Sequence, residues 1–103
     1  MKQPKFRNKK TVIDGITFDS KKEATRYGQL KLLQQCGQID NLKMQVPFVI
    51  EIGGKKICTY KADFTYIEKS RYVVEDVKGM KTPVYNLKKK LMKAIHGIDI
   101  KEI

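Results

Sequence analysis

Residues 56–78 have the sequence KICTYKADFTYIEKSRYVVEDVK, and this stretch decides the fold. Two runs, Lys56–Ile67 and Arg71–Lys78, are rich in the Val, Ile, Thr and Tyr residues that favour β-strands. Glu68-Lys69-Ser70 between them is a polar turn. A further strand is predicted before the Gly53-Gly54 turn, because alternate positions are apolar there: Val46, Phe48, Ile50 and Ile52. Three strands joined by short turns predict an antiparallel meander.

A helix is predicted on the amino-terminal side of this meander, over about residues 21–36. Ser20-Lys21-Lys22-Glu23 is a capping-box pattern, which satisfies backbone N–H groups at the start of a helix. Gly37 suits the end of the helix. Apolar positions continue at helical spacing: Ala24, Tyr27, Leu30, and Leu32 or Leu33. Residues 11–18 before it are predicted to form a small hairpin around Asp14-Gly15.

A second helix is predicted after the meander, from Thr82-Pro83 to about His96, with the proline at the first helical position. Its predicted apolar stripe consists of Val84, Leu87, Leu91, and Ala94 or Ile95. Ile98–Glu102 is predicted to be a short strand, and the strand–helix–strand order favours a parallel, right-handed crossover. The predicted fold class is therefore α/β, with a mixed central β-sheet flanked by helices.

The chain is small and strongly basic. Its 103 residues predict one domain, and 41% hydrophobic with 32% charged residues is typical of a globular protein. The net charge of +11 favours a polyanionic partner, above all nucleic acid. A basic protein–protein or membrane-surface adaptor is the alternative. No apolar run has the length of a membrane span and no signal-peptide core follows the basic start, so a cytoplasmic location and no membrane partner are expected.

The first ten residues are predicted to be a flexible basic arm, and residues 11–103 the single folded domain. Such arms can lie along phosphates with little sequence preference. The residues of the arm expected to contact nucleic acid are Lys5, Arg7, Lys9 and Lys10. A disordered, solubilising tail is the competing interpretation.

Two acidic positions of the meander are candidates for chemistry. Because strand side chains alternate in direction, Asp76 and Lys78 share a face while Glu75 points the other way. A hairpin register that places Asp63 near Asp76 would bring two carboxylates together, and such a pair can bind Mg²⁺ against a phosphate. Lys78 could then orient the attacking water or stabilise transition-state charge. The competing interpretation is structural, because charged residues are common in exposed strands.

Glu23 is a third acidic candidate. As a capping-box residue, it can reach back to the backbone of Ser20. It also lies with Tyr27 and Leu30 on the stripe expected to face the sheet. Two interpretations of Glu23 therefore remain: it caps the helix, or it takes part in a metal site or positions a water molecule.

Taken together, these elements resemble the PD-(D/E)XK nuclease superfamily. The matching segments are Phe18–Ala24, Tyr60–Phe64 and Val74–Gly79, followed by the helix with Tyr85, Lys88 and Lys90. Their order is similar to the αβββαβ core of that superfamily and covers nearly the whole chain beyond the arm. More narrowly, the chain resembles small phage-encoded proteins related to Holliday-junction resolvases and transposon end-cleaving endonucleases. One departure is Ala62, which stands where many members have a proline.

The resemblance implies a restriction-endonuclease-like fold and a Mg²⁺-dependent endodeoxyribonuclease, in which Mn²⁺ is expected to substitute. It implies Asp63 and Asp76 as metal ligands, Glu23 as the acid of the first helix at the same site, and Lys78 as the catalytic lysine. Glu75 is given no catalytic role. Further expected DNA contacts are Lys61, Lys81, Lys88 and Lys90.

The resemblance also implies a substrate and an assembly. Branched DNA is expected, with the Holliday junction as the best single candidate. Cutting two symmetric strands of a junction requires two active sites, so a homodimer is expected. If the protein is phage-encoded, it acts in the host cytoplasm. The alternative is a non-catalytic, basic DNA-binding protein of a phage or mobile element.

Overall fold

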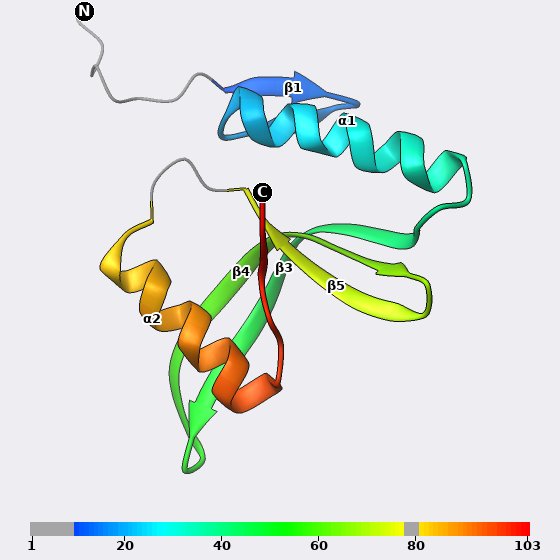
Figure 1. Ribbon diagram of the computed structural model, residues 1–103. Helices are drawn as coiled ribbons and strands as arrows, with labels where there is room; N and C mark the ends of the chain where they lie inside the picture. Colours follow the sequence, from blue (N-terminus) through cyan, green and yellow to red (C-terminus); the bar gives the residue numbers. More distant parts are fainter. Residues whose placement is uncertain (1–9, 78–80) are drawn as a thin grey trace, which may run out of the picture.

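The computed structural model describes residues 10–77 and 81–103. Its elements in chain order are β1 (Thr11–Ile13), β2 (Ile16–Phe18), α1 (Lys21–Gln35), β3 (Asp40–Ile52), β4 (Lys55–Glu68), β5 (Arg71–Asp76), α2 (Pro83–Leu91), the π-helical turn η1 (Met92–His96) and β6 (Lys101–Glu102). The sheet order is β3-β4-β5-β6, and β1 and β2 form a separate hairpin. Figure 1 shows α1 crossing one end of the sheet and α2 lying against the β3–β4 hairpin. The predicted α/β class with a mixed sheet is confirmed.

The amino-terminal hairpin and α1 follow their local sequence signals. Asp14 and Gly15 have left-handed φ values of 54° and 75°, as a two-residue hairpin turn requires. Ser20 caps the helix, because its Oγ accepts a hydrogen bond of 3.1 Å from the backbone N–H of Glu23. The helix ends at Gln35, in agreement with the predicted span. No helix in the described part of the chain is long and apolar enough to cross a bilayer.

The three central strands form the predicted antiparallel meander, with β4 paired to both β3 and β5. Gly53 and Gly54 form the first turn with left-handed φ values of 58° and 79°. β3 begins at Asp40, well before the apolar alternation that starts at Val46. The strand extends in this direction because Leu42 and other side chains of its first half pack against the core beneath α1.

The carboxyl-terminal part makes the predicted parallel pairing. β5 and β6 are parallel neighbours, with Asp76 opposite Glu102. The ladder continues beyond β6, because the backbone N–H of Ile103 donates to the carbonyl oxygen of Asp76 at 3.0 Å. The helical segment between the two strands reaches His96, as predicted, although its last turn is π-helical. Within Ile98–Glu102, only the last two residues pair as a strand.

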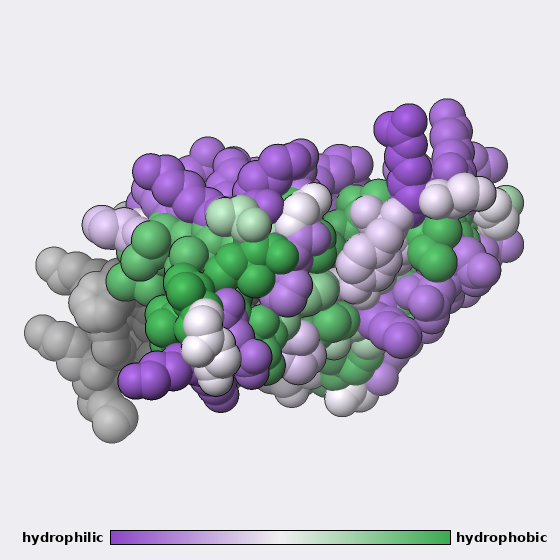
Figure 2. Space-filling model, turned by 90° about the horizontal axis from the view of Figure 1, so that it is seen from below, coloured by the Kyte–Doolittle hydropathy of each residue, from purple (hydrophilic) through white to green (hydrophobic). Residues whose placement is uncertain are grey.

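The predicted apolar stripe of α2 is only partly correct, since Leu91 packs against the core but the first two members do not. Val84 and Leu87 are 63% and 57% exposed, whereas Tyr85 and Met92 are only 6% and 0% exposed. Tyr85 turns inward because it buries its ring while its hydroxyl donates to Glu102 at 2.7 Å, which suits an amphipathic side chain. Figure 2 shows hydrophobic surface gathered on the side of the molecule where α2 lies.

The core is divided into two clusters. The cluster on the α1 side contains Phe18, Ala24, Tyr27, Leu30, Ile39, Phe64 and Tyr66. The cluster on the α2 side contains Ile50, Tyr60, Ala62, Val74, Tyr85, Met92 and Ile100. β5 contributes to both clusters, since Val73 packs against the first and Val74 belongs to the second, and Val77 just after the strand also packs against the first. Glu75 and Asp76 therefore point to opposite sides, as strand alternation predicts.

Candidate active site

The register of β4 and β5 brings Asp63 and Asp76 together. Phe64 pairs with Glu75, so the residue before Phe64 faces the residue after Glu75 across the antiparallel ladder. Directly opposite residues have their Cβ atoms about 5 Å apart. The electrostatics agree with this placement, because the neighbouring Asp76 carboxyl is among the groups that raise the pKa of Asp63. The structure thus contains the carboxylate pair on which the sequence interpretation depends.

Each acid of this pair is also held by a donor from the fold. The backbone N–H of Val77 donates to Asp63 Oδ2 at 2.8 Å. The hydroxyl of Tyr60 donates to Asp76 Oδ2 at 2.7 Å, and Asp76 is only 1% exposed. Burial, and then the hydrogen bond to Asp76, raise the pKa of Tyr60, so this hydroxyl stays protonated as a donor. The pair is therefore fixed in place by β4 and β5.

Asp63 favours its protonated form. Burial first, and then the hydrogen bond to Asp76, raise the pKa of Asp63 from 3.8 to about 8, against the opposing effect of the Val77 N–H. At neutral pH the raised pKa therefore favours the neutral form of the Asp63 carboxyl. A carboxyl group must lose its proton before it can bind a metal ion.

We expect Asp63→Asn to stabilise the protein in alkaline solution. The folded protein keeps a proton on Asp63 up to about pH 8, whereas the unfolded chain releases it near pH 4. The contribution of this group to stability is therefore greatest below pH 4 and is lost as the pH rises to 8. Asparagine removes the ionisation, so the variant should be about 1–2 kcal/mol more stable at pH 9.

Thermal unfolding at pH 5 and pH 9, with a chelator present, measures this difference. The gain at pH 9 should shrink at pH 5, where the wild-type carboxyl is already neutral. A variant that is less stable than the wild type at both pH values would show that the pair does not carry the unfavourable charge assigned to it.

The backbone and the side chain of Glu23 have different partners, and its carboxylate hydrogen-bonds Gln45 rather than the Ser20 backbone. Its backbone N–H makes the capping bond to Ser20, yet its carboxylate accepts a hydrogen bond of 2.8 Å from Gln45 Nε2. Glu23 is only 6% exposed. Burial first, and then the charges of Asp19 and Asp76, raise the pKa of Glu23, which places its carboxylate within electrostatic reach of the acidic pair.

Within residues 10–77 and 81–103, no group of three acidic, histidine or cysteine side chains converges closely enough to hold a metal by itself. The close contact is the Asp63–Asp76 pair, and Glu23 interacts with it through its charge. Lys78 lies outside the described residues. The described part of the predicted site is therefore a two-carboxylate centre with a third acid beside it.

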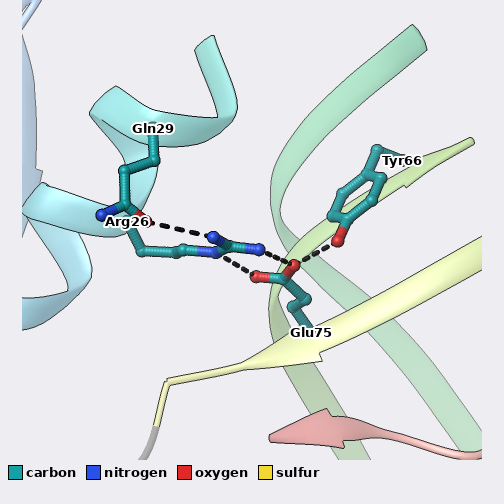
Figure 3. Close-up of polar contacts among 4 residues, drawn as sticks. All are labelled: Arg26, Gln29, Tyr66 and Glu75. Carbon is teal, nitrogen blue, oxygen red and sulfur yellow. Dashed lines mark hydrogen bonds and ion pairs between the residues drawn. The ribbon is translucent and has the colours of Figure 1, made fainter. Parts of the chain in front are cut away.

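A buried ion pair ties α1 to the strand that carries Asp76. Figure 3 shows the guanidinium of Arg26 meeting the carboxylate of Glu75, with Nε to Oε1 at 2.9 Å and Nη2 to Oε2 at 2.6 Å. The hydroxyl of Tyr66 also donates to Glu75 Oε2, and Glu75 is fully buried. Arg26 lies one turn beyond Glu23 on α1, and Glu75 precedes Asp76 on β5. The Arg26–Glu75 ion pair therefore holds together the two elements that carry Glu23 and Asp76.

The predicted DNA contacts have different environments. Lys5, Arg7 and Lys9 lie outside the described residues, while Lys10, Lys61 and Lys90 are exposed. Lys81 makes a 2.9 Å ion pair with Glu102, and hydrogen bonds from Lys81 and then Tyr85 lower the pKa of Glu102 to about 2. Lys88 is used differently, since its Nζ donates to the carbonyl oxygen of Thr59 at 3.1 Å and so links α2 to β4.

Three residues of the site were not singled out from the sequence: Arg26, Gln45 and Tyr60. Arg26 had a usable signal, because it follows Glu23 by three positions near the edge of the buried helix face. No sequence signal pointed to Tyr60, because side chains alternate in direction along a flat strand and Tyr60 would then point away from Asp63. β4 twists there: Ala62 packs on the α2 side and Phe64 on the α1 side.

A family model described as "Protein of unknown function (DUF1064)" matches residues 3–101. The chain belongs to this family. The DUF1064 match contains α1 and all three central strands, so it includes Glu23, Asp63 and Asp76. No curated protein and no solved structure matches the chain.

Proposed function

We propose that the protein is a metal-dependent DNA endonuclease of the PD-(D/E)XK type with a restriction-endonuclease-like fold. The observation that carries the proposal is the register of β4 and β5 that sets Asp63 beside Asp76, with the pKa of Asp63 raised by burial and by its neighbour. Support comes from Glu23 on α1 and from the element order α1, β3, β4, β5, α2, β6. The net charge of +11 suits a nucleic-acid substrate.

A functional role explains why two acids are kept in contact. Bringing two carboxyl groups together in a desolvated place opposes their ionisation and reduces stability. A purely structural acid is better placed beside a cation, as Glu75 is beside Arg26 at 2.6 Å. Strongly shifted pKa values that arise from burial plus a like-charged neighbour cluster at functional sites.

The donor set fits Mg²⁺. Mg²⁺ takes oxygen ligands and is commonly bound by one or two carboxylates, with waters and substrate phosphates completing the shell. Asp63 and Asp76 would hold the cation, and Asp63 would lose its proton when the cation binds. When bound, such an ion lowers the pKa of a coordinated water and polarises the phosphate. Mn²⁺ has similar ligand preferences and should substitute.

The remaining residues have assigned roles in this proposal. Glu23, which is buried on α1 and interacts electrostatically with Asp76, orients the attacking water beside the pair. Tyr60 and the Val77 backbone keep the two metal-binding carboxylates in position. Lys78, two residues beyond Asp76, stabilises the negative charge that develops on the phosphate in the transition state.

Branched DNA, with the Holliday junction first, is the proposed substrate, and this part of the proposal rests on the family resemblance. A homodimer would supply the two sites that symmetric cleavage of a junction needs. Val84 and Leu87 on the exposed face of α2 offer an apolar surface for such a contact.

The proposal is tested by incubating the protein with labelled four-way junction, fork and linear duplex, with and without Mg²⁺. Cleavage that requires the metal, and that is strongest on the junction, is expected. Metal-dependent cleavage of linear duplex alone would keep the activity and overturn the branched substrate. Salt-sensitive binding to DNA without cleavage in Mg²⁺ or Mn²⁺ would instead support the non-catalytic DNA-binding protein.

A further inference from the structure

Gln45 occupies an unusual position in β3. Its φ is 54°, in the left-handed region that residues other than Gly, Asn and Asp rarely adopt. Its neighbours pair normally, Met44 with Phe64 and Val46 with Ala62, so Gln45 stands across the ladder from Asp63. The strained residue of the edge strand therefore lies beside the acidic pair.

The side chain of Gln45 reaches from β3 to α1. Its Nε2 donates to Glu23 Oε2 at 2.8 Å, which connects β3 to the buried acid of α1. If residue 45 had the usual extended backbone, its side chain would follow the regular alternation of direction along the strand. Left-handed backbone costs free energy and is retained where the surrounding structure or the function requires it.

We infer that Gln45 is a positioning residue, which holds the carboxylate of Glu23 toward the Asp63–Asp76 pair and so acts on the reaction through Glu23. This inference rests on the proposed nuclease function. The amide group is suited to the task, because it donates a hydrogen bond without adding a charge to the site.

Gln45→Gly is the informative variant. Glycine adopts a φ of 54° without strain, so the fold should be as stable as the wild type or more stable. The hydrogen bond to Glu23 is lost. We expect kcat for DNA cleavage to fall by about 10- to 100-fold, as is usual when a residue that orients a functional group is removed. KM for DNA should stay unchanged.

Ser70→Gly is the matched control. Ser70 also has a left-handed φ, of 65°, but lies in the turn between β4 and β5. Glycine also adopts this φ, so the turn and the register of β4 and β5 are kept. This variant should be at least as stable as the wild type and should cleave DNA at the wild-type rate. A fall in kcat for Gln45→Gly alone thus separates the loss of the amide from a change in backbone strain.

A second comparison tests whether Gln45 acts through Glu23. In a Glu23→Ala protein, adding Gln45→Gly should cause no further loss of kcat. Wild-type cleavage by the single variant Gln45→Gly, or additive losses in the double variant, would overturn the inference and leave the nuclease proposal intact. Absence of cleavage by the wild-type protein would overturn the nuclease proposal and the inference with it.

Discussion

Asp76→Asn is expected to lower the rate of DNA cleavage by at least about 10³-fold. A metal ion contributes several kcal/mol of transition-state stabilisation, and each 1.36 kcal/mol changes a rate tenfold. Asparagine has the shape of aspartate and can still accept the Tyr60 hydrogen bond, so the fold should persist. DNA binding should be largely kept, because it depends on the basic surface.

Glu51→Gln is the control for this variant. Glu51 is exposed in the distal part of β3, so the substitution removes one negative charge without touching the pair. Rates measured on the preferred DNA substrate at equal Mg²⁺ should be close to wild type for Glu51→Gln. Unchanged cleavage by purified Asp76→Asn would contradict the assignment of Asp76 as a metal ligand.

Arg26→Met is expected to destabilise the protein by about 3–5 kcal/mol, since it leaves the carboxylate of Glu75 buried without its cation. For a domain of this size, such a loss lowers the melting temperature by at least about 15 °C. The double variant Arg26→Met/Glu75→Leu should recover most of the stability, because replacing both partners of a buried pair by apolar residues is often neutral.

Lys31→Met provides the comparison with an exposed pair. Lys31 and Asp14 are also 2.6 Å apart, yet their side chains are 41% and 48% exposed. Exposed ion pairs contribute at most about 1 kcal/mol, so this variant should melt close to the wild type. Equal losses in chemical-denaturant unfolding for Arg26→Met and Lys31→Met would show that burial of Glu75 does not decide the effect.

Local signals predicted most of the fold, and tertiary contacts explain the errors. The Ser20 cap, the Gly53-Gly54 turn and the alternation of β4 and β5 are short-range patterns, and the structure follows them. The buried face of α2 is decided instead by its partners. Tyr85 can hydrogen-bond Glu102 from inside the core, so it displaces the more hydrophobic Val84 to the surface.

In the candidate site, too, local sequence patterns predicted some features and longer-range contacts determine the others. Alternation along one strand was enough to separate Asp76 from Glu75. The contact between Asp63 and Asp76 depends on the register of two strands, which the two-residue turn at Lys69 and Ser70 sets through left-handed φ values of 51° and 65°. Non-glycine residues give no clear sequence signal for such a turn. Gln45 was not predicted either, because its left-handed backbone is also formed by a residue other than glycine.

Calorimetric titration of Mg²⁺ or Mn²⁺ into the protein at pH 7, repeated in buffers of different ionisation enthalpy, tests the acidic pair most directly. Because the pKa of Asp63 is about 8, binding should release about one proton per ion. Both the binding and the proton release should be lost in Asp63→Asn and kept in Glu51→Gln. Absence of metal binding by the wild type, or the same binding and proton release in Asp63→Asn, would contradict a metal site at Asp63 and Asp76.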